Sequence, residues 1–252
     1  MSLKRLDILV VQRGLAKSRE EAKELILSGS VWSQGLALSK PATQVDVNHP
    51  LELRTTEERF SSRAGLKLQH AIETFQVSPK DRICLDIGSS TGGFTDCLLK
   101  RGAKQVFAVD VGYGLLDYRL RNDKRVTLLE RKNARYLERE DLMKLDSSAE
   151  SISLVTIDVS FISLNKIIPA VKTTVCSGTD FLLLFKPQFE VSKDAISKKG
   201  LVKDEKKVFS TLEEFSTFMK NEGFIQHGNA EASPVAGKKS GNVEYLLHFQ
   251  KI

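Results

Sequence analysis

Apolar stretches of strand length alternate with amphipathic stretches through most of the chain, and this alternation predicts an α/β fold. Five apolar runs have the length of strands and lie at residues 82–87, 105–110, 126–129, 153–158 and 179–186. Helical spacing appears between them, beginning with the apolar stripe of Ala64, Leu68, Ala71, Ile72 and Phe75. Strands that alternate with helices form a parallel sheet with helices on both faces. We therefore expect such a sheet as the core.

The pattern after residue 160 predicts how the sheet closes. An amphipathic helix is expected from residue 163 or 164 to 176, and the polar, lysine-rich segment 188–203 is expected to be a mobile loop. The core face of the next helix should consist of Phe209, Leu212, Phe215, Phe218 and Met219. Two strands at 223–230 and 241–249 then form a closing hairpin, with Glu244 inside the second strand.

The start of the chain is organised as a separate small module. Ser18 and Glu21 form a capping box at the beginning of an amphipathic helix. Short strands are expected at 31–33 and 51–53, with glycine and proline turns between them.

A polar, charged stretch at 55–59 follows this module, so we predict two domains, at 1–58 and 59–252. A chain of 252 residues is long enough for one large α/β domain and one small domain. Its 41% hydrophobic and 28% charged residues are typical of an ordinary globular protein.

The longest apolar runs are far shorter than the ~20 residues that cross a bilayer. The three cysteines are too few and too widely spaced for a disulfide framework or a zinc site. We expect a cytoplasmic protein without a metal.

Positive charge is concentrated in one region of the chain. The net charge is +6, and residues 100–144 hold twelve lysines and arginines against seven acids. This excess favours a phosphate-bearing partner, although solvated surface is the alternative for any single residue. Residues 1–60 hold nine basic and eight acidic side chains, so RNA binding there requires the basic ones to gather on one face.

A glycine turn follows the first strand of the predicted sheet. It runs from Asp86 through Gly88 and a Ser/Thr-rich segment to Gly92 and Gly93, where a helix begins. The spacing is G-x-x-x-G-G, whereas a dinucleotide fingerprint reads G-x-G-x-x-G. An acid at the strand end suits a ligand with an amino group better than a phosphate. S-adenosylmethionine, with an ammonium, a sulfonium and no phosphate, is such a ligand. The alternative is an ordinary strand-to-helix turn.

The second strand also ends in an acid, Asp110, where a ribose would lie. An acid at this position also binds ribose in dinucleotide folds, so Asp110 indicates an adenosine-containing cofactor without specifying which one. Asn133 follows the third strand and is expected near the adenine. The predicted cofactor residues are Asp86, Gly88, Ser89, Gly92, Gly93, Phe94, Asp110, Val111 and Asn133.

Three early segments resemble the S4 RNA-binding domain of ribosomal and RNA-modifying proteins. They are Leu3-Lys-Arg-Leu-Asp-Ile-Leu, Gly14-Leu-Ala-Lys-Ser-Arg and Ile26-Leu-Ser-Gly-Ser-Val-Trp. The resemblance implies a small α+β domain that binds RNA. We expect its phosphate contacts to come from Arg5, Lys17, Arg19 and Lys23. Without the resemblance, a solvated helix face of mixed charge would be an equal interpretation.

Four further segments resemble a single family. They are Ser62-Arg-Ala-Gly-Leu-Lys-Leu, Asp86-Ile-Gly-Ser-Ser-Thr-Gly-Gly-Phe-Thr-Asp, Asp158-Val-Ser-Phe-Ile-Ser-Leu and Lys186-Pro-Gln-Phe-Glu. With the S4-like start, they make nearly the whole chain similar to the TlyA or hemolysin A family of FtsJ-like ribosomal RNA 2′-O-methyltransferases. The resemblance implies a Rossmann-like, seven-stranded methyltransferase fold behind the S4-like domain. It also implies S-adenosylmethionine as methyl donor and cytidine ribose in ribosomal RNA or ribosomal subunits as acceptor.

The Lys-Asp-Lys-Glu tetrad of FtsJ-like enzymes matches Lys67, Asp158, Lys186 and Glu244. A ribose hydroxyl is a poor nucleophile, so the enzyme must align it with the methyl group and take its proton. A lysine accepts a proton only when neutral, and burial beside a second cation favours that form. We therefore expect Lys186, which closes a buried strand, to be the general base. The alternative is an ion-pair network that only closes the end of the sheet.

Three other functions compete with RNA methylation. A membrane-active hemolysin needs a long apolar segment or a lytic amphipathic helix, and neither is evident in the sequence. A non-catalytic RNA-binding or ribosome-assembly factor would not need the tetrad. A small-molecule methyltransferase would need neither the S4-like module nor the excess of positive charge. RNA 2′-O-methylation is thus the leading hypothesis.

Overall fold

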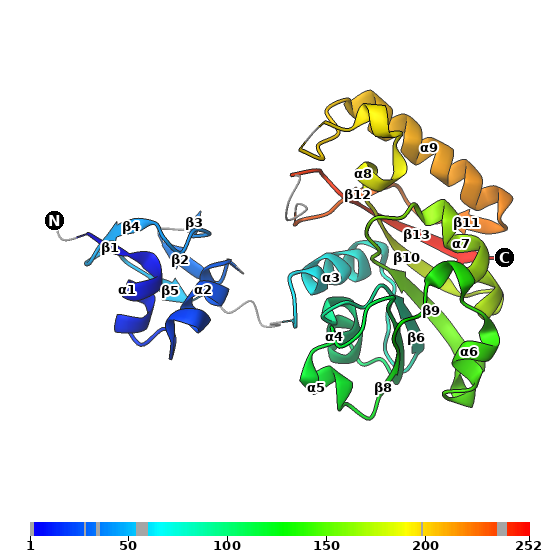
Figure 1. Ribbon diagram of the computed structural model, residues 1–252, viewed down its shortest axis with the longest axis horizontal. Coiled ribbons are helices and arrows are strands. Elements are labelled where there is room, and N and C mark those ends of the chain that lie inside the picture. Colours follow the sequence, from blue (N-terminus) through cyan, green and yellow to red (C-terminus); the bar gives the residue numbers. More distant parts are fainter. Residues whose placement is uncertain (1–2, 28, 34–35, 54–59, 198, 236–240) are drawn as a thin grey trace. The chain divides into compact units, whose positions relative to one another are not determined.

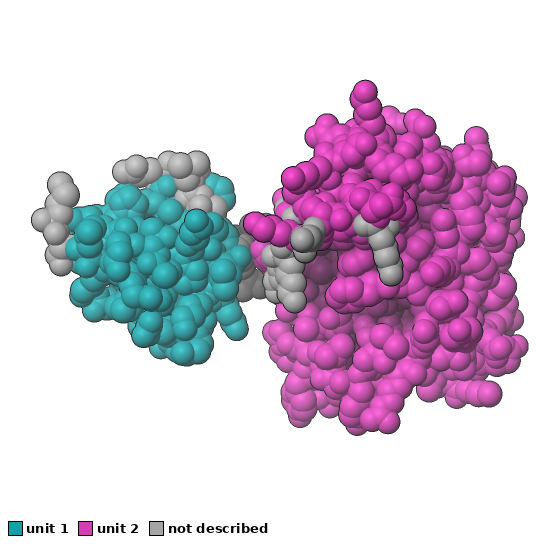
Figure 2. All heavy atoms as spheres, turned by 45° about the horizontal axis from the view of Figure 1, so that its top comes forward, with its two compact units in different colours: residues 1–59 teal, residues 60–252 magenta. Residues whose placement is uncertain are grey.

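The protein forms two compact units, residues 1–59 and 60–252 (Figure 2). The structure is a computed structural model and describes all residues except 1–2, 28, 34–35, 54–59, 198 and 236–240. The linker predicted at 55–59 therefore lies outside the described residues. Each unit has hydrophobic clusters made only of its own residues.

Unit 1 is a small α+β domain. Its elements are β1 (Leu3–Arg5), α1 (Leu6–Gln12), α2 (Arg19–Leu27), β2 (Val31–Ser33), β3 (Leu36–Ala37), β4 (Gln44–Asp46) and β5 (Glu52–Leu53). Strand β1 pairs with β4, and β2 lies between β3 and β5, all antiparallel. The predicted start of α2 is confirmed, because the Ser18 hydroxyl accepts a hydrogen bond from the Glu21 amide at 3.1 Å. Helix α1 was not predicted, since seven residues show too little periodicity.

Unit 2 is built on one twisted sheet (Figure 1). Its strands are β6 (Ile83–Ile87), β7 (Gln105–Val109), β8 (Val126–Leu129), β9 (Ile152–Ile157), β10 (Asp180–Phe185), β11 (Phe224–Gln226), β12 (Glu231–Ala232) and β13 (Tyr245–Lys251). The order is β11-β13-β10-β9-β6-β7-β8, and the short β12 pairs with β13 beside this path. Strands β6 to β10 are parallel to one another, whereas β13 runs antiparallel to its neighbours β10 and β11. This is the expected seven-stranded sheet, with β12 as a small addition.

Helices cover both faces of the sheet and bury a core under each (Figure 1). One core is shared by the helices α3 (Ala64–Phe75), α4 (Gly93–Lys100) and α5 (Tyr118–Arg121). The other is shared by α6 (Arg139–Met143), α7 (Ile168–Val171) and α9 (Glu205–Asn221). A further short helix, α8 (Pro187–Glu190), follows β10. The described 3₁₀ turns are η1 (Ala134–Tyr136), η2 (Ser147–Ser151), η3 (Leu164–Lys166), η4 (Lys172–Thr174) and η5 (Lys193–Ala195). Because both faces are covered, the central strands read as continuous apolar runs.

Two segments differ from their predicted structures. The single helix expected between residues 163 and 176 is divided into η3, α7 and η4. Pro169 lies in the first turn of α7 and has no amide to donate, so one continuous helix cannot form. The segment 188–203, expected to be a mobile loop, contains most of α8, the turn η5 and a bridge between Ile196 and Val202. Pro187 favours a helix start at this point, which the polar composition concealed.

Two predictions near the C-terminus need correction. Phe209 is 53% exposed and Val208 is buried in its place, so the core face of α9 is rotated from the predicted one. Glu244 lies immediately before β13 and not inside a strand. Asn242, two residues before Glu244, bonds the 200–202 segment, since its side chain donates to Gly200 O at 2.8 Å and accepts from Val202 N at 2.9 Å.

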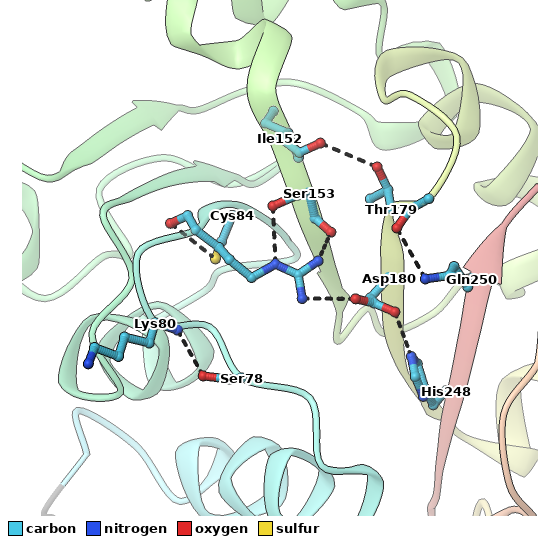
Figure 3. Close-up of polar contacts among 11 residues, drawn as sticks. Ser78, Lys80, Cys84, Ile152, Ser153, Thr179, Asp180, His248 and Gln250 are labelled. Carbon is cyan, nitrogen blue, oxygen red and sulfur yellow. Dashed lines mark hydrogen bonds and ion pairs between the residues drawn. The ribbon is translucent and has the colours of Figure 1, made fainter.

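Polar contacts join the amino-terminal ends of several strands (Figure 3). Asp180, at the start of β10, contacts Nη1 of Arg82 at 2.8 Å and Nε2 of His248 at 2.9 Å. Nε of Arg82 also donates to the Ser153 hydroxyl of β9 at 3.1 Å. These contacts fix the starts of the parallel strands β6, β9 and β10 relative to one another and to the second half of the antiparallel β13.

Candidate active site

A cavity of about 150 Å³ lies at the carboxyl ends of the central strands of unit 2. Parallel α/β sheets commonly bind ligands at this edge. The cavity is lined by the glycine turn after β6, the start of α3 and the residues that follow β9 and β10: Ser62, Ala64, Gly88, Ser89, Ser90, Thr91, Gly93, Phe94, Asp158, Ser160 and Lys186.

The glycines of the turn allow backbone segments to approach closely. Gly88 has a positive φ of 83°, and a Cβ there would lie 2.5 Å from the Asp158 carbonyl oxygen. A Cβ on Gly92 would meet the Leu120 side chain at 2.2 Å, and one on Gly93 would meet the Ser62 hydroxyl at 2.3 Å. The glycine spacing is therefore required by the packing of α3, α5 and the end of β9 around the cavity, whatever ligand binds there.

Asp110 holds the cavity's loops together. Its carboxylate accepts hydrogen bonds from the Ser90 amide at 2.8 Å and the Gly112 amide at 2.7 Å. This joins the glycine turn to the end of β7. Each carboxylate oxygen can accept a further hydrogen bond, so the expected ribose contact is compatible with this arrangement.

Asp86 is buried in the sheet and does not line the cavity. Its carboxylate accepts hydrogen bonds from the hydroxyls of Thr95 at 2.6 Å and Thr156 at 2.9 Å. Burial raises the pKa of Asp86 to about 7, because no cation compensates the charge. Because Asp86 does not line the cavity, a direct contact with the methionine end of the ligand is not part of this geometry, and a contact through water stays a prediction.

The four residues of the predicted tetrad form two ion pairs at neighbouring strand ends. Lys186 follows β10 and contacts Oδ1 of Asp158 at 2.6 Å. Lys67 of α3 contacts Oε2 of Glu244 at 2.5 Å. The antiparallel register of β10 and β13 pairs Phe185 with Tyr245, so Lys186, just after β10, and Glu244, just before β13, lie on the same edge of the sheet.

Burial distinguishes these lysines from ordinary surface lysines. Lys67 is 9% exposed and Lys186 is 8% exposed, whereas the helix pattern alone placed Lys67 off the apolar face of α3. A buried ammonium requires a carboxylate partner, and each lysine has one. Lys186 also donates a hydrogen bond to the Ser160 hydroxyl at 3.0 Å, a contact the sequence analysis did not anticipate.

Of the remaining predicted cofactor residues, Ser89 and Phe94 line the cavity, whereas Val111 and Asn133 are not in its lining. Ser89 and Phe94 are buried in its lining, and the Ser89 hydroxyl has no hydrogen-bond partner among the described residues. An unpaired buried hydroxyl at a cavity fits a polar ligand. Val111 is 69% exposed beside Asp110. The Asn133 side chain caps η1 by accepting from the Arg135 amide at 3.0 Å.

In unit 1, two of the four predicted RNA contacts meet at a buried acid. Arg5 and Arg19 each place an Nη2 atom 3.0 Å from Oδ2 of Asp7, and both arginines remain partly exposed. These contacts hold the pKa of Asp7 well below its usual range, the hydrogen bond from Arg5 being the main cause. Lys17 and Lys23 are exposed. The buried acid Asp7 therefore holds two of the basic side chains together, a role that the sequence pattern did not indicate.

Many basic residues between 100 and 144 are paired with acids. The ion pairs are Lys100–Asp96, Arg101–Glu73, Arg119–Asp117, Arg121–Glu130, Arg125–Asp123, Lys132–Asp141 and Arg139–Glu150. Two arginines lie over aromatic rings instead: Arg131 is 4.2 Å from the Tyr113 centroid and Arg135 is 5.5 Å from that of Tyr136. Fewer of these basic side chains are therefore available to a phosphate-bearing partner than the charge count alone suggested.

Within the described residues, no helix is long and apolar enough to span a membrane. The family described as FtsJ-like methyltransferase matches residues 60–251, and the S4 domain family matches residues 4–51.

Relatives match along almost the whole chain. The protein named 16S/23S rRNA (cytidine-2′-O)-methyltransferase TlyA from Mycobacterium tuberculosis is 43% identical, with 96% of this chain and 88% of the relative covered. The protein named Hemolysin A from Brachyspira hyodysenteriae is 40% identical over 97% of this chain and 99% of its own. A solved Streptococcus thermophilus structure described as a hemolysin is 40% identical, has a TM-score of 0.74 and covers 100% of this chain and 89% of that chain. The chain therefore belongs to the TlyA or hemolysin A family of FtsJ-like methyltransferases that carry an S4 domain.

Proposed function

We propose that this protein transfers a methyl group from S-adenosylmethionine to the ribose 2′-hydroxyl of cytidine in ribosomal RNA, with Lys186 as general base. The observation that carries the proposal is the position of Lys186, buried at the end of β10, on the cavity wall and 2.6 Å from Asp158. The name of the Mycobacterium tuberculosis relative supports the choice of ribosomal RNA and cytidine.

The cavity lining, together with Asp110, which accepts a hydrogen bond from the Ser90 amide of that lining, supplies what a methyl donor of this kind requires. Ser89 offers an unpaired hydroxyl, and Asp110 has spare acceptor capacity for ribose hydroxyls. When bound, S-adenosylmethionine supplies an electrophilic methyl group: the 2′-oxygen bonds to the methyl carbon while the carbon–sulfur bond breaks and its electron pair stays on sulfur.

The tetrad residues manage the proton of the acceptor hydroxyl. Neutral Lys186 takes that proton as the oxygen attacks and becomes an ammonium that Asp158 stabilises. Lys67, paired with Glu244, brings a second cation to the same edge of the sheet. Asp158 and Glu244 balance the two lysines, so the site holds no uncompensated buried charge after the proton arrives.

Unit 1 contributes affinity for the RNA backbone. Arg5 and Arg19, oriented by Asp7, together with the exposed Lys17 and Lys23, would contact phosphates. An S4 domain ahead of a methyltransferase fold favours a structured RNA over a small molecule as the acceptor.

The decisive experiment measures methyl transfer to ribosomal RNA by wild type and by Lys186→Ala and Lys186→Arg. Both variants are expected to lose at least 100-fold in kcat while keeping their affinity for S-adenosylmethionine, since general-base catalysis contributes ~10²–10⁴-fold. Arginine fails because a guanidinium does not give up its proton at accessible pH.

Lys220→Ala, at the exposed end of α9, is the matched control and should behave as wild type. A Lys186→Arg variant with near-normal turnover would show that the position needs only positive charge. The general-base role would then have to be abandoned.

A further inference from the structure

Ser160 lies on the cavity wall and is the second hydrogen-bond partner of Lys186. Its hydroxyl is 3.0 Å from Nζ of Lys186, and Oδ1 of Asp158 is 2.6 Å from the same atom. We propose that Ser160 is a positioning residue that, together with Asp158, directs the lone pair of neutral Lys186 toward the acceptor hydroxyl. This inference rests on the proposed role of Lys186 as general base.

The argument follows from the shape of an amine. Neutral Nζ carries two hydrogens and one lone pair, arranged tetrahedrally with the Cε bond. Asp158 alone fixes one hydrogen and leaves the lone pair free to occupy either of the two remaining directions. A second acceptor at Ser160 takes the other hydrogen, so the lone pair has one remaining direction. General-base catalysis depends on this alignment as much as on the availability of the base.

The loop that carries Ser160 is fixed to the segment that follows Lys186. The carboxylate of Glu190, in α8, accepts hydrogen bonds from the Ser163 hydroxyl at 2.6 Å and the Leu164 amide at 2.9 Å. The rings of Phe161 and Phe189 lie 5.3 Å apart. Lys186 immediately precedes α8, so these contacts hold the loop after β9 at a fixed distance from Lys186.

The backbone conformation of Phe161 and the hydrogen bonds of the buried Glu190 both indicate that the loop after β9 has one defined conformation. Phe161 has a φ of 67°, a left-handed conformation that is strained for a non-glycine residue. Burial raises the pKa of Glu190, yet both of its oxygens are used as acceptors within the loop. The left-handed residue Phe161 changes the direction of the chain directly after Ser160, whose hydroxyl lies beside Nζ of Lys186.

The test compares Ser160→Ala with Ser160→Thr, which restores a hydroxyl at the same position. Ser160→Ala is expected to lower kcat about 10-fold with KM for RNA and for S-adenosylmethionine within two-fold of wild type. Ser160→Thr should recover most of the activity. The fold loss of the alanine variant should be the same at every pH tested, because orientation and not protonation is impaired. Ser177→Ala, an exposed serine before β10, is the control for substitution itself.

A second variant tests the loop rather than the hydroxyl. Glu190→Ala keeps Ser160 but removes the acceptor that holds Ser163 and Leu164, so it should reproduce the kcat defect. Thermal unfolding of each variant identifies those that lose activity through instability.

A measurement without turnover separates this inference from the proposed function. In protein with ¹⁵N-labelled lysine, NMR relaxation of the Lys186 side-chain nitrogen should show greater mobility in Ser160→Ala and wild-type mobility in Ser160→Thr. Unchanged mobility in Ser160→Ala, a deficit confined to KM for RNA, or failure of threonine to restore kcat would each overturn the positioning role. Wild type that orders Lys186 through Ser160 but transfers no methyl group would refute the proposed function alone.

Discussion

Two buried aspartates show how the immediate surroundings of a side chain set its charge. Asp7 receives hydrogen bonds from two arginines, and its pKa is held below the usual range, the contact with Arg5 being the main cause. Asp86 receives hydrogen bonds from neutral groups of Thr95 and Thr156, and burial raises its pKa to about 7. Both are fully buried, so it is the presence or absence of a cation that separates them.

Asp86→Asn should change the pH dependence of stability. Between the ordinary aspartate pKa of ~3.9 and about 7, folded Asp86 keeps its proton while the unfolded chain has lost it, so wild-type stability falls as pH rises. Above about 7 this decline ends. Asparagine cannot ionise, so the free energy of unfolding of the variant minus that of wild type should rise by about 2 kcal/mol between pH 5 and pH 8.

Urea denaturation at several pH values measures this difference. Glu214→Gln, an exposed acid on α9, is the control and should show no such trend. A difference between Asp86→Asn and wild type that stays constant from pH 5 to pH 8 would mean that Asp86 is ionised in the folded protein throughout this range.

The strand ends around the cavity depend on backbone approach as well as on side chains. The end of β6 lies so close to the residue after β9 that Gly88 cannot carry a Cβ without moving the Asp158 carbonyl. Gly178, before β10, has the same φ of 83°, but a Cβ there would have no heavy atom within 4 Å. Substitutions at both glycines carry the cost of a positive φ, but only a substitution at Gly88 adds a steric clash. Comparing the two therefore separates these costs.

Gly88→Ala is expected to destabilise the protein more than Gly178→Ala. Both substitutions place alanine at positive φ, which costs ~1–2 kcal/mol. Gly88→Ala also pushes the Asp158 backbone away, for a further loss of about 1–3 kcal/mol and a weaker affinity for S-adenosylmethionine. Chemical denaturation and calorimetric titration of the two variants measure this. Equal losses of stability would show that β9 moves aside at no cost.

The division into two units assigns different tasks to different parts of the chain. Unit 1 encloses its own small cluster around Leu6, Val10 and Ile26, and the two larger clusters belong entirely to unit 2. Neither unit relies on the other for its core. The cavity and both tetrad ion pairs lie in unit 2.

Deleting residues 1–59 should therefore leave unit 2 folded and able to bind S-adenosylmethionine. RNA affinity should fall, and the dependence of log K on log salt should become less steep, because each lost phosphate contact removes about one unit of slope. Filter binding across a salt series, together with transfer assays on ribosomal subunits, measures both effects. A truncated protein that methylates subunits as well as the full chain would exclude an RNA-binding role for unit 1.

The sequence by itself determined the parallel sheet, the glycine turn and the small N-terminal domain, because apolar periodicity and turn residues act over a few neighbouring positions. The family resemblance nominated the tetrad, whose catalytic roles stay predictions. Only the tertiary structure decided which acid meets which lysine. Lys67 and Glu244 are 177 positions apart, and Ser160 and Lys186 are 26 apart. Such contacts depend on strand order and loop conformation, which local pattern does not encode. The burial of Asp86 and the pairing of Arg5 and Arg19 with Asp7 were decided in the same way.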